Sequence, residues 1–335
     1  MRLTAALILS AFVASWATPA HAVSFSFAHV GNAGNAADPR TGLGAVAYSY
    51  SISKTEVTNA QYVEFLNKVD PAGSNALGLF YASMAGVNGG IEKTGATDGA
   101  RYVARAGREQ QPVSSVSFFH AMRFVNWLHN GQGNGGTESG VYTIGSGIDE
   151  VRSANAKFWI PSQDEWYKAA YHDSTAGTAG VYFDFPTGSN AIPISDKPAD
   201  NPSAANYFND DGLANGFNDG YAVSGSTSPI PGALFTDVGA YTQAASPYGT
   251  FDQDGNVEEW NESVGPGFAR DLRGSSAMGG YPEMQVDWRN WAHPMFGHET
   301  FGFRVATVPE PGAAVLGAMA VAGLFFRKRD DELTC

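Results

Sequence analysis

The sequence predicts a single mixed α+β domain that is rich in loops and low in regular secondary structure. Forty glycines stand among its 335 residues, together with clusters of Asn, Asp and Ser, while charged residues make up only 16%. This composition is typical of a backbone with many tight turns. Helix-start signals and short apolar segments both occur, so a few helices and brief strands are expected. With 43% apolar residues the chain can bury a core.

Three helix starts follow from capping patterns. Thr58 and Gln61 form a capping box in EVTNAQYVEFLNKV, ahead of an apolar stripe at helical spacing. Ser117 can cap a second helix in SFFHAMRFVNWLHNG. Ser162 and Glu165 form another box in PSQDEWYKAAYHD. Between the turns, pieces such as AVAYSYSIS and FGFRVATV suit short strands.

The N-terminal residues 1–22 are predicted to be a signal peptide. Arg2 precedes an apolar segment, and Ala20 and Ala22 form a small-residue cleavage pattern ahead of Val23. An uncleaved membrane anchor is the alternative, but the apolar run is shorter than the roughly 20 residues that a span needs. We therefore expect the protein to be exported.

The C-terminal residues 308–335 contain a Pro-Glu-Pro motif, an apolar stretch at 312–326 and a basic cluster at 327–329. By composition the stretch is a marginal membrane helix with a cytoplasmic basic stop. The order of the three parts resembles the PEP-CTERM sorting signal of Gram-negative bacteria. The resemblance implies transient inner-membrane anchoring through 312–326 and removal of the tail by an exosortase, with the product at the cell surface or outside the cell. The trailing DDELTC departs from such signals, which usually stop at the basic cluster.

The net charge and the cysteine content limit the classes of binding partner and of crosslink that the chain can have. The formal net charge is −13, so a polyanion such as nucleic acid would be repelled, and cations or neutral glycans fit better. The single cysteine, Cys335, is the last residue, so no intramolecular disulfide can form. An exported domain without disulfides would gain from calcium as a crosslink.

Residues 23–307 contain no Pro-rich linker, charge block or internal repeat, which indicates one domain. Six segments of this part, in order, resemble the sulfatase-modifying-factor domain, the fold of the formylglycine-generating enzyme. They are KTEVTNAQYVEFLN (54–67), QPVSSVSFFHAMRFVNWL (111–128), FWIPSQDEWYKAAY (158–171), YGTFDQDGNVEEW (248–260), LRGSS (272–276) and FGFRVA (301–306). The resemblance implies that enzyme's variant of the C-type lectin fold.

The same resemblance implies structural calcium at two places. The first ligand set has two side chains and two carbonyls, from Asp252, Glu259, Gly255 and Val257. The second set has the same composition, from Asn206, Asp219, Tyr207 and Tyr221. Calcium takes six to eight oxygen ligands, and backbone carbonyls are common among them. From the residues alone, DQDG and NDG favour plain turns.

The catalytic centre of the family is not matched. The formylglycine-generating enzyme binds copper(I) through two cysteine thiolates, which are soft ligands suited to that metal. Counting back from FGFRVA places those positions near Gln285 and Asn290, and neither amide replaces a thiolate. The family's RGGSW is RGSSA at 273–277 here, and WEW is EEW at 258–260. No copper and no catalytic residue are therefore expected.

The segment around those positions suits contact with a ligand. Aromatic faces with arginine and amide donors are typical of sites that bind sugars or peptides. The candidate ligand-binding residues are Trp288, Arg289, Asn290, Trp291 and His293. We predict an exported, non-catalytic domain that binds a glycan such as an exopolysaccharide, or a surface protein.

Other interpretations of these residues stay open. Both tryptophans could be core residues under a long loop. A formylglycine-generating oxidase is the alternative function, and a matrix-packing domain without a discrete ligand is a third. A metal centre at His293, His298 and Glu299 is disfavoured because the spacing fits no metal motif. His120 and His129 are expected to be structural.

Overall fold

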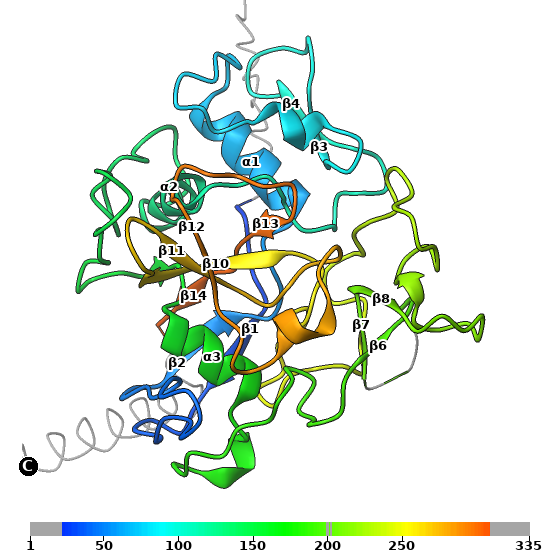
Figure 1. The fold of residues 1–335 in the computed structure, drawn as a ribbon. Coiled ribbons are helices and arrows are strands. Elements are labelled where there is room, and N and C mark those ends of the chain that lie inside the picture. Colours follow the sequence, from blue (N-terminus) through cyan, green and yellow to red (C-terminus); the bar gives the residue numbers. More distant parts are fainter. Residues whose placement is uncertain (1–21, 199–200, 202, 309–335) are drawn as a thin grey trace, which may run out of the picture.

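The computed structural model describes residues 22–198, 201 and 203–308. Three α-helices are distributed along this part, α1 (Asn59–Val69), α2 (Phe118–His129) and α3 (Gln163–Tyr171). The longest has 12 residues, as expected for a loop-rich chain. In Figure 1, α1 and α2 lie on one side of the central strands and α3 lies on the other. The predicted α+β class is confirmed.

All three predicted helix starts are confirmed. The Thr58 hydroxyl accepts the backbone N–H of Gln61, whose side chain accepts the N–H of Thr58 in return. Ser162 and Glu165 make the same reciprocal pair at α3. At α2, Ser117 pairs in this way with His120, which replaces the usual Glu or Gln of a capping box. These pairs satisfy backbone donors that a helix leaves free in its first turn.

A first sheet joins the two ends of the described chain. Its strand order is β1 (Phe27–Val30), β2 (Tyr50–Ser53), β14 (Ala306–Thr307) and β5 (Phe158–Trp159). All three pairings are antiparallel. The last strand therefore lies between two strands from the first half of the chain.

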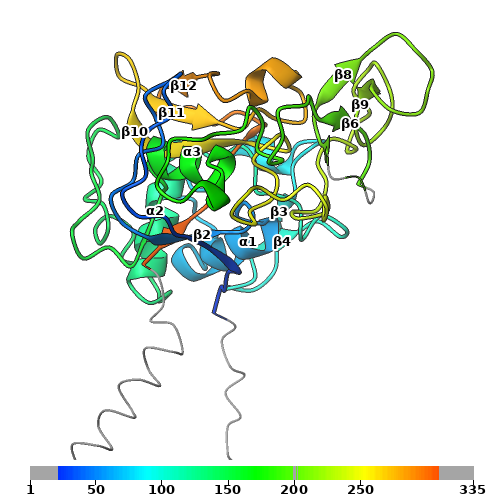
Figure 2. The ribbon, with the colours of Figure 1, turned by 90° about the horizontal axis from the view of Figure 1, so that it is seen from below.

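A second sheet lies near the centre of the molecule in the view of Figure 1 and along its upper side in Figure 2. Its strand order is β12 (Asn290–Ala292), β11 (Arg270–Arg273), β10 (Glu258–Val264) and β13 (Phe301–Gly302). The β10–β13 pair is parallel and the other pairs are antiparallel. The apolar segment FGFRVATV is thus split, because it gives β13 to this sheet and β14 to the first.

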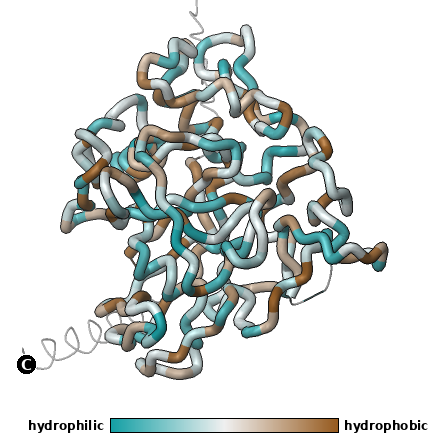
Figure 3. The backbone as a smooth tube through the Cα atoms, viewed as in Figure 1, coloured by the Kyte–Doolittle hydropathy of each residue, from teal (hydrophilic) through white to brown (hydrophobic). Residues whose placement is uncertain are grey.

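The remaining regular structure is short. Three two-stranded pairs are β3 (Ile91–Lys93) with β4 (Tyr102–Ala104), β6 (Ile194–Ser195) with β7 (Ala204–Ala205), and β8 (Phe208–Asp210) with β9 (Asp219–Tyr221). Three 3₁₀ turns are η1 (Ala82–Ala85), η2 (Ser174–Ala176) and η3 (Tyr281–Met284). The β8–β9 hairpin projects from the body in both ribbon views. Figure 3 shows hydrophobic and hydrophilic residues alternating at short intervals along the tube.

One buried side chain links the two sheets. The Arg304 guanidinium donates to the carbonyls of Ser53 and Lys54, at the end of β2, and to that of Phe251. It also forms a two-point pair with the fully buried carboxylate of Glu259 on β10. Arg304 lies between β13 and β14, so this pair holds both sheets and the loop before β10 in register.

The predicted terminal signals fall largely outside the described residues. This holds for the signal peptide through residue 21 and for the sorting signal from residue 309 onward. Among the residues that the structure describes, none of the helices has the length and apolar character needed to cross a membrane.

Candidate functional site

The predicted ligand-binding residues lie on and beside an edge strand of the second sheet. Trp288 is 39% exposed and Trp291, on β12, is 45% exposed. The alternative that both tryptophans belong to the core is therefore wrong. Arg289 and His293 are exposed as well. Exposed apolar side chains that together form one patch are typical of contact surfaces.

Further exposed groups border this strand. The turn between β10 and β11 passes close to Trp291, because a Cβ added at Gly265 would lie 3.0 Å from the Trp291 Cβ. Val264, the last residue of β10, is 53% exposed, and Phe268 in this turn is 69% exposed. We call Trp288, Arg289, Trp291 and Phe268 the tryptophan edge.

A buried acid stands opposite Trp291 on the neighbouring strand. Asp271 pairs with Trp291 in the β11–β12 register. Burial raises the pKa of Asp271 to about 6, although Arg273 and Arg289 act in the opposite direction. The side chain of Arg289 also reaches the carbonyl of Thr41 at 3.3 Å, which fixes the edge against an N-terminal loop.

Asn290 belongs to a different feature. Its amide Nδ2 donates to Glu258 Oε1 at 2.7 Å. Side chains of adjacent strand residues point to opposite faces of a sheet, so Asn290 and Trp291 diverge. The predicted group of five is thus divided, because Asn290 reaches a pocket around Glu258 while Trp288, Arg289 and Trp291 lie at the edge. The fifth residue, His293, is exposed just beyond β12.

This pocket has a volume of about 320 Å³. Its walls come from β10, the loop after β11, η3 and the segment before β13. The lining residues are Glu258, Ser276, Met278, Gly279, Glu283, Phe296, His298, Thr300 and Phe301. We call it the Glu258 pocket.

Glu258 is the most perturbed group of the pocket. Burial raises its pKa to about 7, and the nearby Glu283 acts in the same direction, while the hydrogen bond from Asn290 opposes them. In the sequence, Glu258 stands out only as a departure from the family's WEW pattern. That departure was the available signal, since it puts an acid where the family has a tryptophan.

The two histidines near the pocket, His293 and His298, have different surroundings. His298 Nδ1 lies 2.8 Å from Thr300 Oγ1, and its ring stacks on Phe296. His293 does not line the pocket, and Glu299 is 3.3 Å from the amide of Asn88. Within residues 22–198, 201 and 203–308, no three His, Cys, Asp or Glu side chains are grouped to hold a metal ion.

The first predicted calcium set is only partly free to bind a cation. Glu259 accepts from Arg304 Nε and Nη2 at 2.5 and 2.6 Å and from Trp166 Nε1 at 2.8 Å. A carboxylate offers about four lone pairs, so one direction on Oε1 remains. Asp252 Oδ1 is buried without a partner among the described residues, and Oδ2 accepts the N–H of Gly239. Asp252 therefore fits a calcium ligand better than Glu259 does.

Other acids accompany Asp252. Glu56 Oε2 and Asp254 Oδ2 are also buried without a partner in the described part of the chain. Burial raises the pKa of Asp252 to about 6 and that of Asp254 to about 8. Burial and the Asp252 charge raise the pKa of Glu56 as well. A cation would relieve this crowding of carboxyl groups. The sequence did not indicate Glu56, which is distant along the chain.

The second predicted set is engaged by the protein itself. Asp219 accepts backbone N–H groups of Asn215 and Gly216 in the β8–β9 loop. The Tyr207 carbonyl accepts the Ser195 hydroxyl. The Tyr221 carbonyl accepts the N–H groups of Ser224 and Gly225.

Register separates this second set further. Asp219 pairs with Asp210, four positions along the chain from Asn206. The amide of Asn206 donates to Leu234 and Asn256, away from the hairpin. The structure thus does not bring the Asn206 and Asp219 side chains together.

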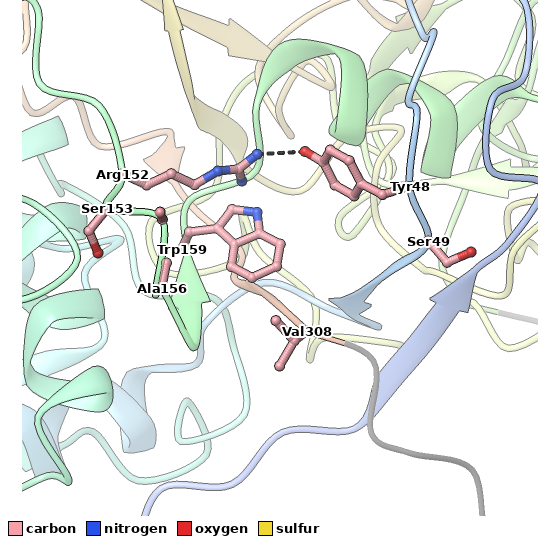
Figure 4. A pocket seen from close by; sticks show the side chains of 8 residues that line it. Tyr48, Ser49, Arg152, Ser153, Ala156, Trp159 and Val308 are labelled. Atoms are coloured by element: carbon pink, nitrogen blue, oxygen red, sulfur yellow. Dashed lines mark hydrogen bonds between the residues drawn. The ribbon is translucent and has the colours of Figure 1, made fainter. Parts of the chain in front are cut away.

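A second pocket, shown in Figure 4, lies beside β5. Arg152 donates to the Tyr48 hydroxyl at 2.7 Å and its guanidinium lies 4.7 Å from the Trp159 ring centroid. Arg152 also forms ion pairs with Glu165 and Glu262. The positive charge of Arg152 is therefore balanced by carboxylates of the protein itself. The acids of the Glu258 pocket have no such ion-pair partner among the described residues.

Fold and sites together define a class of protein, an α+β domain with extensive loops whose two small sheets are joined by a buried Arg–Glu pair. The family follows from the sequence, because residues 29–308 match the sulfatase-modifying factor enzyme 1-like domain and the chain belongs to that family. No curated protein matches the chain. The predicted formylglycine-generating enzyme-type fold is confirmed.

Solved structures of similar fold share little sequence with this chain. The structure titled "Crystal Structure of CarF" is 19% identical, covers 86% of this chain and 99% of its own, and has a TM-score of 0.50. Variable protein 1 of Treponema denticola is 20% identical, covers 87% of this chain and 98% of its own, and has a TM-score of 0.47. At 19% identity, the likeness to the CarF structure is one of fold.

Proposed function

We propose that this protein is a non-catalytic ligand-binding domain that makes contact through its tryptophan edge. The observation that carries the proposal is the exposure of Trp288 and Trp291 at 39% and 45% on an edge of the second sheet. Indole faces beside a guanidinium suit the apolar faces and hydroxyls of sugars, and they also serve as anchors for protein segments. The ligand class is a glycan, such as an exopolysaccharide, or a surface protein.

The residues at the family's copper positions support binding without oxidation. Gln285 and Asn290 stand where the resemblance places the thiolates, and the Asn290 amide is occupied by Glu258. Amides are hard, neutral groups that do not suit copper(I). The only cysteine, Cys335, is separated from this region by the whole C-terminal segment.

Export and sorting belong to the same proposal. The N-terminal pattern supports cleavage before Val23, and the motif order after Val308 supports recognition by an exosortase. Segment 312–326 would anchor the precursor transiently in the inner membrane. The mature domain would then act at the cell surface or in the extracellular matrix.

Calcium is proposed as a structural cofactor. When bound, it would tie the loop before β10 to the body of the fold through oxygen ligands. Asp252, with its free Oδ1, and the carbonyls of Gly255 and Val257 are the donors that support it most directly. Glu56 is a better placed second carboxylate than Glu259, because Glu259 is held by Arg304.

The test of ligand binding compares the full chain with a Trp288→Ala/Trp291→Ala double variant on a glycan array and on native exopolysaccharide. Loss of two central aromatic anchors should weaken binding at least tenfold. Phe217→Ala, an exposed aromatic on the β8–β9 loop, is the matched control and should bind as the parent does. Equal binding by the double variant, or no saturable ligand at all, would overturn the proposal and favour a packing role in the matrix.

A further inference from the structure

The Glu258 pocket is a separate feature from the tryptophan edge. Asn290 reaches Glu258, whereas Trp291 stands opposite Asp271 and beside the β10–β11 turn. Because strand side chains alternate between faces, the pocket and Trp291 lie on opposite sides of the second sheet. Binding in the pocket therefore needs no contact at the edge.

Two carboxyl groups meet in this pocket without a cation. Glu258 is only 6% exposed, and its Oε1 accepts a single hydrogen bond from the neutral amide of Asn290. Glu283, from η3, accepts only the Ser275 hydroxyl, at 3.3 Å, among the residues that the structure describes. In the described part of the chain, neither acid forms an ion pair. Carboxylates removed from water are costly unless a positive charge accompanies them.

Aromatic rings form the other wall. Phe296 and Phe301 pack with ring centroids 5.9 Å apart at 77°, and Phe296 remains 53% exposed. The His298 ring stacks on Phe296 and contacts Phe301. An ammonium or guanidinium group gains from lying over such rings. This wall would hold an organic cation better than a hydrated ion.

The volume of the Glu258 pocket and the arrangement of its acids also favour an organic cation. The volume of about 320 Å³ is at the lower end of the roughly 300–1,000 Å³ of ligand pockets, so it suits one side chain or a small amine. Glu258, Glu283 and His298 all line it, yet the described residues contain no group of three such side chains arranged for a metal. The net charge of −13 would also draw cations to the protein.

We propose that the Glu258 pocket binds an alkylammonium or guanidinium group, held by the carboxylates of Glu258 and Glu283 and packed on Phe296 and Phe301. The cation comes either from a basic side chain of a protein or from a free amine. This inference goes beyond the proposed function and does not rest on it.

Calorimetric titration of the full chain tests the inference with matched probes. The small probes are n-butylammonium, n-butylguanidinium and the neutral isostere n-butylurea. The peptide probes are acetyl-Gly-Lys-Gly-amide and acetyl-Gly-Arg-Gly-amide, with acetyl-Gly-Gln-Gly-amide as the neutral control. We expect the cations to bind and the neutral probes to bind at least tenfold more weakly. Tighter binding of the peptides than of the small amines identifies a protein side chain as the source, and the reverse order identifies a free amine.

Variants of the pocket complete the test. Glu258→Gln retains an acceptor for Asn290 and removes the charge, so it should weaken cation binding at least tenfold. Glu283→Gln should weaken it as well and serves if the first variant fails to fold. Trp291→Ala, across the sheet, should leave cation binding unchanged even if it abolishes glycan binding. Absence of cation binding by the parent, equal binding of butylurea, or unchanged affinity in both Gln variants would overturn the proposal.

Discussion

Glu258 and Glu259 are neighbours on β10, yet the protein surrounds them in different ways. Glu259 is fully buried and accepts three hydrogen bonds, two from Arg304 and one from Trp166. Glu258 accepts one bond from a neutral amide and opens to a pocket. A carboxylate matched by a cation holds the scaffold together, whereas one without a cation remains available to a ligand. Strand alternation places these two roles on opposite faces of the sheet.

Removing the cation from Glu259 should have the largest effect. Arg304→Ala would leave a buried carboxylate unpaired, which costs about 3 to 5 kcal/mol of the free energy of unfolding. Urea denaturation measures this loss. Arg101→Ala breaks an ion pair with the exposed Asp98 and should cost less than about 1 kcal/mol. A similar loss in both variants would contradict the structural role of the Arg304–Glu259 pair.

His120 is a third buried titratable side chain to compare with Glu258 and Glu259. Its ring nitrogens have hydrogen-bond partners when the imidazole is neutral. Its Nδ1 accepts the N–H of Ser117 and its Nε2 lies 2.8 Å from the Gly78 carbonyl, so protonation of Nδ1 would break the cap of α2. Burial lowers its pKa from 6.5 to about 4. The unfolded chain therefore takes up a proton first as pH falls, and stability is lost between about pH 6.5 and 4.

This acid sensitivity should amount to roughly 3 kcal/mol. Unfolding free energies measured by urea across that pH window give its size. His120→Gln preserves a capping box at the third helical position but does not titrate, so its stability should depend less on pH there. An identical pH dependence in parent and variant would show that another group is responsible.

Calcium binding tests whether Asp252 is available to a ligand, as Glu258 is, or serves only the scaffold, as Glu259 does. At a hundredfold excess over the dissociation constant, calcium would stabilise the fold by roughly 2.7 kcal/mol, and a chelator would lower the melting temperature. Asp252→Asn should abolish most of this shift, and Asp98→Asn, on the surface, should not alter it. A smaller calcium-dependent shift in the Asp219→Asn variant would support the second predicted set of calcium ligands. A melting curve unchanged by the chelator would contradict both sets.

The smallest effect is expected for neutralising Glu258 itself. Glu258→Gln retains the hydrogen bond from Asn290 and removes a charge that no cation balances, so the free energy of unfolding should change by less than about 1 kcal/mol. Glu259→Gln should cost more, because it leaves Arg304 buried without a counter-ion. If both variants lose the same free energy of unfolding, Glu258 and Glu259 do not differ in structural role.

Local sequence patterns were sufficient for the helices and the class. The boxes at Thr58 and Ser162 are confirmed because capping depends on residues only three positions apart. Strand boundaries were less accessible. FGFRVATV is a single apolar segment, but Arg304 inside it binds Glu259, and the chain passes from one sheet to the other there.

The candidate site was predicted in part. Trp288, Trp291 and Asn290 were indicated by composition, but which face each would take depends on the β11–β12 register. The Glu258 pocket was not predicted, since its lining comes from β10, η3, β13 and irregular segments that only the folded chain brings together. Glu56 was missed for a related reason, as only the folded chain brings it to the acids of the loop before β10.

The place of β14 has a consequence for how the protein is made. This strand lies between β2 and β5, so the first sheet stays incomplete until residues 306–307 have been synthesised. Contacts so distant along the chain form slowly and late. During synthesis the first sheet can therefore close only when nearly the whole domain has been made.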